Sequence, residues 1–447
     1  MGTLLLLAYL WVASDPVPMQ QKFYATVISI LSIIPIVAYL LDRRAPIVPM
    51  MAVNCLFYLF AFGINGFYYS HDQTILAKTT EQGWIRGLEL GIIGLSAQMF
   101  GYYLTKALFG RPRPIRVITN LSPERIRFLA WSLLAFRILM VAVPGAAEIP
   151  TVNQFTKLIP FISVGMLVML SLTHRLELFE RILLYAVVIP LELMYRLNTG
   201  AVYEPVLFVI YVFFVRWVIT RRISWPIILA GAAIFTIFNP IKFQYREVVW
   251  RTSVGKEMSS PEKLSLFLSL AVDHWLSGDV AGDDIRTNLL TRLNHLALAA
   301  IVTDSTPNVI PYWNGETLEL GMVAFVPRFL WPNKPGLTFG NQFGIRYGII
   351  DETMGGTTVN LTWVTELYAN FGFMAVVFGM AFIGMAFAGF ERWFATPGTA
   401  LIDVAIPFST TFPLVYPESN IVMSWGGVIT SAIVFYSLAW VLMRKSS

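Results

Sequence analysis

The sequence has few charged residues and almost no cysteine. Only 13% of its 447 residues are charged, against about 25% in typical soluble domains. The single cysteine, Cys55, permits no disulfide within the chain and no CxxC metal site, and we interpret it as a small buried side chain. The four histidines lack a metal-ligand spacing such as HExxH, and no glycine-rich loop resembles a P-loop. The sequence therefore gives no support to a metal site or to soluble nucleotide chemistry.

Long apolar runs are abundant instead. Hydrophobic residues make up 56% of the chain, in runs such as FYATVISILSIIPIVAYLL and VLFVIYVFFV. A helix that crosses a bilayer needs about 20 mostly apolar residues, so we predict an all-α polytopic membrane protein with about 12 transmembrane helices. The first run lacks a basic leader and a cleavage site, and we expect it to be a retained helix. The expected spans are approximately 2–14, 22–41, 47–68, 87–108, 124–145, 157–173, 180–197, 202–220, 224–242, 360–390, 399–416 and 422–443.

Basic residues follow the even-numbered spans. Cytoplasmic loops of membrane proteins carry an excess of Lys and Arg. In a chain with twelve spans, all of the clusters of basic residues that follow the even-numbered spans fall on one side of the membrane. We therefore expect both termini to be cytoplasmic. The net charge of +5 is then a consequence of loop topology. The clusters lie at 43–44, 106–127, 174–181, 216–222, 392 and 444–445.

A long hydrophilic segment, 243–359, separates the ninth and tenth expected spans and would lie on the outer face. Loops of this length are usually functional. We therefore divide the chain into N-terminal spans (1–242), one large extracytoplasmic loop (243–359) and C-terminal spans (360–447). Within the loop, Ser260 followed by Pro261 predicts a helix start. A second helix is expected from Asp283 to about residue 302.

That second helix would carry one polar face. Asp284, Asn288, Arg292 and His295 recur at helical spacing beside a row of leucines. Such a face is either solvated or directed into a polar site above the membrane. The sequence leaves both interpretations open.

Several cations lie on stiff or aromatic-rich backbone in the loop. The segment FVPRFLWPNKP (325–335) places Arg328 and Lys334 among three prolines, and Arg346 follows in FGIRYG. Arg246 lies upstream in KFQYREVVWR. Guanidinium is the natural bidentate partner of phosphate or carboxylate, so converging arginines at a membrane surface suit a lipid-linked phosphate. An outer-face location argues against nucleic acid as the partner.

Ionisable residues also occur within expected spans. Glu366, in TWVTELYANFG, would lie about two turns inside the tenth span with Asn370 four residues later, and such a residue is a functional candidate by default. Arg137 and the pair Glu192–Arg196 are either structural partners or functional groups.

Three motifs resemble those of a known family. FVPRFLWPNKP, FGNQFGIRYG and TWVTELYANFG are similar to segments of the Wzy-type polymerases, which join oligosaccharide repeat units of bacterial surface polysaccharides. The resemblance is most specific over roughly 290–375, and the layout of many spans with one large outer loop agrees with it. It implies a GT-C-like, metal-independent glycosyltransferase of the bacterial inner membrane without a cofactor, its large loop periplasmic or extracellular.

The resemblance also implies substrates and partners. A growing glycan would move from undecaprenyl diphosphate onto the hydroxyl of another lipid-linked repeat unit in the bilayer. A chain-length regulator protein and a flippase would be protein partners.

Site roles follow from that chemistry, because the leaving diphosphate needs cations and the acceptor hydroxyl needs a base. Relatives often carry an arginine where this chain has NTGAVYEP (198–205), and Arg196 precedes that stretch. We favour Glu366 over His295 as the base. The expected diphosphate ligands are Arg292, Arg328 and Arg346, with Lys334 and Arg246 as further candidates, and the expected sugar-stacking residues are Trp313, Trp331 and Tyr347.

Three alternatives stay open. A ligase of the O-antigen type would share the layout but would consume a lipid A core acceptor. A flippase or transporter often shows internal repeats, and this chain shows none. A structural scaffold for polysaccharide export would leave the loop arginines without a role.

Overall fold

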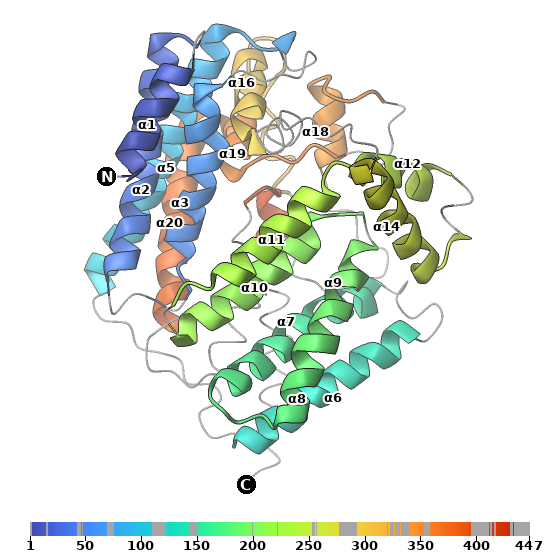
Figure 1. The fold of residues 1–447 in the computed structure, drawn as a ribbon. Helices are drawn as coiled ribbons and strands as arrows, with labels where there is room; N and C mark the ends of the chain where they lie inside the picture. The colour runs from blue at the N-terminus through green and yellow to red at the C-terminus, as the bar shows by residue number, and fades with distance from the viewer. Residues whose placement is uncertain are drawn as a thin grey trace. The chain divides into compact units, whose positions relative to one another are not determined.

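In the computed structural model, all regular secondary structure of the described residues is helical (Figure 1). The described residues are 2–14, 17–42, 46, 48–68, 76–109, 122–142, 150–198, 200–220, 222–252, 255, 257–276, 293–319, 321, 326, 331, 339–352, 358–394, 411, 414, 417–429 and 432. The chain forms two compact units. Unit 1 contains 1–117, 290–399 and 410–447, and unit 2 contains 118–289 and 400–409. Each unit therefore joins distant parts of the sequence.

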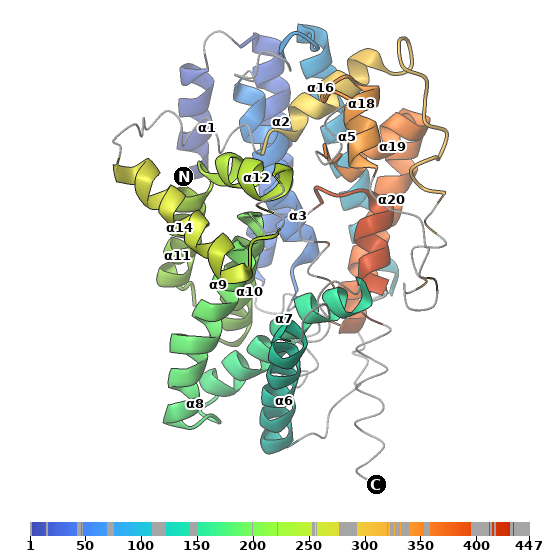
Figure 2. The same cartoon turned by 90° about the vertical axis from the view of Figure 1, so that its right-hand side faces the viewer.

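Unit 1 combines the N-terminal helices with the helices that follow residue 290 (Figures 1 and 2). Its N-terminal elements are α1 (Gly2–Ala13), α2 (Met19–Leu41), α3 (Met50–Tyr58), η1 (Leu59–Ile64), η2 (Asn65–Phe67) and α5 (Glu81–Phe109). Its later elements are α16 (His295–Ser305), α18 (Gly340–Arg346), α19 (Trp363–Phe371) and α20 (Phe373–Phe394).

Glycines allow α5 and α20 to approach closely. A Cβ atom added to Gly101 would lie 2.0 Å from the carbonyl oxygen of Ala381, and one added to Gly384 would lie 2.0 Å from that of Gln98. Small residues bring the backbones of membrane helices together in this way. Helix α5 also packs against α16, where Gly87 meets the backbone of that helix.

Among the described residues, three stretches are long and apolar enough to cross a membrane, and all belong to unit 1: Met19–Leu41, Met50–Phe67 and Phe373–Arg392. The chain is thus an all-helical protein, over its described residues, with helices suited to a bilayer. The expected span at 360–390 contains two helices, and its first part lies outside the candidate stretch Phe373–Arg392. Helix α19 ends at Phe371, and the φ of +75° at Gly372 breaks the helix before α20 begins at Phe373. The division of the chain at 242 and 359 stays a prediction of topology.

Unit 2 consists of α6 (Pro123–Ala142), α7 (Pro150–Leu172), α8 (Leu178–Ile182), η4 (Leu183–Val188), α9 (Ile189–Leu197), α10 (Tyr203–Thr220), α11 (Trp225–Phe238), α12 (Lys242–Arg251) and α14 (Ser260–Leu276). Tyr245 and Phe267 are fully buried in a cluster that joins α9, α10, α12 and α14. Helix α14 begins at Ser260, one residue before the predicted first helical position, and Ser259 rather than Ser260 makes the contacts of a cap. The Glu262 carboxylate accepts from the Ser259 backbone and hydroxyl at 2.7 and 2.6 Å.

A buried ionic cluster links α6 and α9 in unit 2. Glu192 pairs with Arg196 one turn later at 2.9 Å and with Arg137 at 2.8 Å. All three side chains are less than a tenth exposed. The Arg196 guanidinium also lies over the rings of Phe161 and Phe208. The predicted Glu192–Arg196 pair is therefore present, and Arg137 extends it.

Candidate functional site

Helix α19 carries the strongest sequence candidate of unit 1. Every residue from Trp363 to Asn370 is buried, so this helix has no solvated face. Glu366 and Asn370, four residues apart, are the polar exceptions within it, together with Thr365. Because α19 precedes the candidate span that begins at Phe373, Glu366 lies outside that span.

The Glu366 carboxyl is 1% exposed and only partly satisfied. Its Oε2 accepts from the backbone N–H of Ile421 at 2.7 Å. Its Oε1 has no hydrogen-bond partner among the residues that the structure describes. Burial raises the pKa of Glu366 to about 7, although the Ile421 N–H and the nearby Thr317 hydroxyl oppose the rise. A carboxyl of this kind changes protonation near neutral pH.

Asn370 fixes a tight turn beside that carboxyl. The turn, Trp313–Glu316, has positive φ at both central residues, +50° at Asn314 and +93° at Gly315, as a type I′ turn requires. The Gly315 N–H donates to Asn370 Oδ1 at 2.9 Å, and Asn370 Nδ2 donates to the Thr317 hydroxyl at 2.8 Å. A fully buried amide therefore holds the 313–317 backbone against α19.

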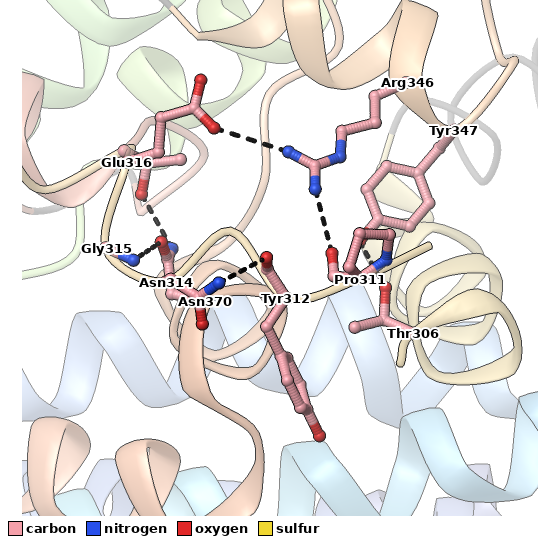
Figure 3. A network of polar contacts seen from close by, with 10 residues as sticks. Thr306, Pro311, Tyr312, Asn314, Gly315, Glu316, Arg346, Tyr347 and Asn370 are labelled. Carbon is pink, nitrogen blue, oxygen red and sulfur yellow. Dashed lines mark hydrogen bonds and ion pairs between the residues drawn. The ribbon is translucent and has the colours of Figure 1, made fainter. Parts of the chain in front are cut away.

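Arg346 lies on the other side of this turn (Figure 3). Its guanidinium lies 4.2 Å from the centre of the Trp313 ring, and its Nη2 donates to the Pro311 carbonyl at 3.0 Å. Its Nη1 is 3.5 Å from Glu316 Oε2. The Arg346 side chain is 28% exposed, so the cation is held in place but still reaches the surface.

Two tyrosines connect this region to α16. The hydroxyls of Tyr347 and Thr306 lie 2.6 Å apart, and the Tyr368 hydroxyl donates to the Thr306 carbonyl at 3.1 Å. Burial raises the pKa of Tyr368, and the nearby Arg86 guanidinium opposes part of that rise. Lys78 lies beside Gly348, since a Cβ added there would be 3.0 Å from its Nζ. Lys78, just before α5, and Arg86, within α5, thus lie near Gly348 and Tyr368 respectively.

A small cavity is lined in part by Glu366. The cavity volume is about 20 Å³. This is room for one or two waters or for a single hydroxyl group. Trp313 forms one wall, and Arg346 lies against the same ring. The lining residues are Trp313, Thr317, Phe339, Gly340, Phe343, Val359, Asn360, Leu361, Glu366, Ala369, Asn370 and Asn420.

His295, the second candidate for the base, lies apart from this cavity. It is 3% exposed at the first position of α16, its ring contacts Phe57, and its Nε2 is 3.5 Å from Glu418. The segment from Glu418 to Ile421 therefore touches both candidates: it faces His295 at one end and donates to Glu366 at the other. Within the described residues, α16 begins at His295 with Asn294 as its cap, and the part of the expected helix at 283–292 lies outside those residues.

Among the remaining predicted residues, the structure describes Trp331 and Arg246. Arg292, Arg328 and Lys334 lie outside the described residues. Trp331 is 39% exposed and does not line the cavity. Arg246 belongs to unit 2, where its Nε donates to the Gly200 carbonyl at 3.1 Å.

Sequence reasoning missed Thr317, Asn420, Lys78 and Arg86. The Asn-Gly pair at 314–315 is a strong turn signal, and it could have predicted that Thr317 follows a tight turn. Lys78 and Arg86 gave no such signal, because isolated cations before a span are common.

No curated protein and no solved structure matches the chain. One family model does, and it covers residues 46–446, nearly the whole chain. The chain therefore belongs to the family described as a domain of unknown function (DUF8712).

Proposed function

We propose that this protein is a membrane glycosyltransferase that polymerises lipid-diphosphate-linked oligosaccharide repeat units. The proposal includes a twelve-span, GT-C-like architecture in a bacterial inner membrane, with the Glu366 site on the outer side. It rests on the resemblance of three sequence motifs to Wzy-type polymerases and on the geometry around Glu366.

One observation carries the proposal. Glu366 combines a buried carboxyl, one oxygen without a partner among the described residues, and a pKa of about 7. A general base works best when its pKa lies near the working pH. The cavity that Glu366 lines has a volume of about 20 Å³, which is room for one hydroxyl group. These are the properties needed to hold and deprotonate an acceptor hydroxyl.

The reaction would proceed as follows. Glu366 takes the proton of the acceptor sugar hydroxyl. At the same time, the oxygen of that hydroxyl forms a bond to the anomeric carbon of the donor glycan. The bond between that carbon and the diphosphate oxygen breaks, and its electron pair leaves with the lipid diphosphate. Glu366 then releases the proton to solvent, which restores the base.

The leaving diphosphate needs positive charge set in place beforehand. Arg346 is the described cation best placed for this role, since Trp313 and the Pro311 carbonyl fix its orientation. Arg86 lies near Tyr368 and Lys78 lies beside Gly348, and both would add to the positive potential. The roles of Arg292, Arg328, Lys334 and Arg246 stay part of the proposal on sequence grounds alone.

The experiment is a polymerisation assay with the purified full chain in lipid nanodiscs and an undecaprenyl-diphosphate-linked oligosaccharide as the only glycan. We expect a ladder of products that differ by one repeat unit. If no ladder forms but glycan is transferred to an added lipid A core acceptor, the protein is a ligase instead. Movement of the substrate across a vesicle membrane without any new glycosidic bond would identify a transporter.

A further inference from the structure

A second polar pocket lies at the other end of the unit 1 helices. Glu391 lies 18 residues after Phe373 on α20, so it is roughly 27 Å further along the helix, close to the thickness of a bilayer's hydrocarbon core. The cavity has a volume of about 140 Å³. It is lined by Pro35, Ala38, Tyr39, Asp42, Pro46, Pro49, Met51, Ala52, Tyr102, Tyr103, Lys106 and Glu391.

The pocket presents both signs of charge in a fixed arrangement. Glu391 is 4% exposed, and it accepts from the Tyr102 hydroxyl and from the Met51 backbone N–H at 3.4 Å. Lys106 Nζ lies 3.7 Å from the Glu391 carboxylate and donates to the Tyr102 hydroxyl at 2.8 Å. The Lys106 side chain is 46% exposed while that of Glu391 is 3% exposed. A deep carboxylate is therefore paired with a cation at the rim.

The surroundings of the pocket are those of a membrane interface. Along α2, Val37, Leu40 and Leu41 are 43%, 59% and 77% exposed, and on α5 Leu108 is 70% exposed. In a bilayer, such residues contact acyl chains. A polar pocket bordered by apolar helix surface is placed to receive the headgroup of a lipid whose chains lie along those helices.

We propose that the Lys106–Glu391 pocket binds the headgroup of a primary-amine phospholipid, phosphatidylethanolamine. The ammonium group would donate hydrogen bonds to the Glu391 carboxylate, and the lipid phosphate would pair with Lys106 at the rim. A purely anionic headgroup would place its negative charge against the Glu391 carboxylate. It would also lack an ammonium group to donate hydrogen bonds to that carboxylate. A choline headgroup has no N–H donor, and three methyl groups enlarge it. This proposal does not depend on the enzymatic role of Glu366, which lies on α19, before the opposite end of α20.

The test measures retention of lipids by the purified full chain with native mass spectrometry. The probes are phosphatidylethanolamine, its monomethyl and dimethyl derivatives, phosphatidylcholine and phosphatidylglycerol, all with the same acyl chains. We expect affinity to fall with each added methyl group. Phosphatidylethanolamine should bind about tenfold more tightly than phosphatidylcholine, as expected for loss of a hydrogen bond to a charged group.

Variants place the effect at this pocket. E391Q keeps the shape of the side chain but removes the negative charge, and it should lose the preference for phosphatidylethanolamine. K106M should weaken binding of every phospholipid in the series. E89Q, which changes a carboxylate of α5 outside the pocket, should behave like the natural protein. Equal affinity of the natural protein across the methyl series, or tighter binding of phosphatidylglycerol, would overturn the proposal even if a variant failed to fold.

Discussion

At the scale of single residues, Arg346 has several contacts that lysine could not reproduce. Its planar guanidinium stacks on Trp313 and at the same time donates to the Pro311 carbonyl. Lysine keeps the charge but loses the stacking and the fork of donors. If Arg346 also orients the diphosphate, R346K should lower the polymerisation rate by about tenfold or more.

The rate should be measured as initial ladder formation at equal amounts of folded protein. R222K, a change at an exposed arginine of unit 2, is the matched control and should have no effect. A normal rate for R346K would remove Arg346 from the list of diphosphate ligands.

Asn370 gives a second prediction at this scale. In N370D, a charged oxygen replaces the Nδ2 group that donates to the Glu366 carbonyl and to the Thr317 hydroxyl, both at 2.8 Å. We expect the free energy of unfolding to fall by about 1–3 kcal/mol, because buried hydrogen bonds are lost without replacement. Thermal unfolding in detergent would measure this loss. N308D, at an exposed position, should leave the unfolding temperature unchanged, and equal unfolding of both variants would contradict the role given to Asn370.

Part of this site could be predicted from the sequence. Glu366 was identifiable because an ionisable residue interrupts an apolar stretch, and Asn370 shares its helix face. The Ile421 N–H that binds Glu366 could not be predicted, since it lies 55 residues away and a backbone donor leaves no trace in the sequence. The same holds for Thr317, which reaches the site only because the Asn314–Gly315 turn folds back onto α19.

At the scale of elements, the close contact of α5 with α20 depends on glycine. G101A and G384A would each place a methyl group 2.0 Å from a backbone carbonyl oxygen of the opposing helix. We expect either change to force the helices apart and to destabilise the protein by about 1–3 kcal/mol or more. G427A is the control, because a Cβ atom added there meets nothing within 4 Å. Unfolding temperatures of G101A and G384A equal to that of G427A would show that the helices do not pack as described.

Element boundaries were less predictable than element type. The apolar stretch at 360–390 reads as one span because glycine is common in transmembrane helices. Only the backbone shows that Gly372 has a φ of +75°, where an added Cβ would lie 2.9 Å from the Tyr312 hydroxyl. The break separates α19, which carries Glu366, from α20, which is long and apolar enough to cross a membrane. The end of α19 is therefore visible in the backbone and not in the hydropathy of the sequence.

At the scale of the whole molecule, hydropathy predicted the class of protein but not its division into units. The contact of α16 with α5 joins residues about two hundred positions apart, and it rests on a stripe of small residues rather than on any local signal. The number of spans and the orientation come from the positive-inside pattern alone.

That orientation gives a prediction for intact cells. Cys55, the only cysteine, is replaced by alanine, and single cysteines are introduced at Glu319 or at Arg175, both exposed. A membrane-impermeant maleimide should label residue 319, next to the proposed site, and should not label residue 175, which follows the sixth expected span. Labelling of residue 175 alone would place the Glu366 site on the cytoplasmic side, where a periplasmic polymerase would have no substrate.

The central claim is that Glu366 is the base of glycosyl transfer, and the pH dependence of ladder formation tests it most directly. Below a pH of about 7 the buried carboxyl is protonated and cannot accept the hydroxyl proton, so the rate should rise as the pH passes through about 7. E366Q should lower the rate by roughly 100- to 10,000-fold and abolish this rise, while E319Q, at an exposed carboxylate of the same segment, should preserve both. An E366Q variant that forms ladders at the natural rate, with the natural pH profile, would contradict the account.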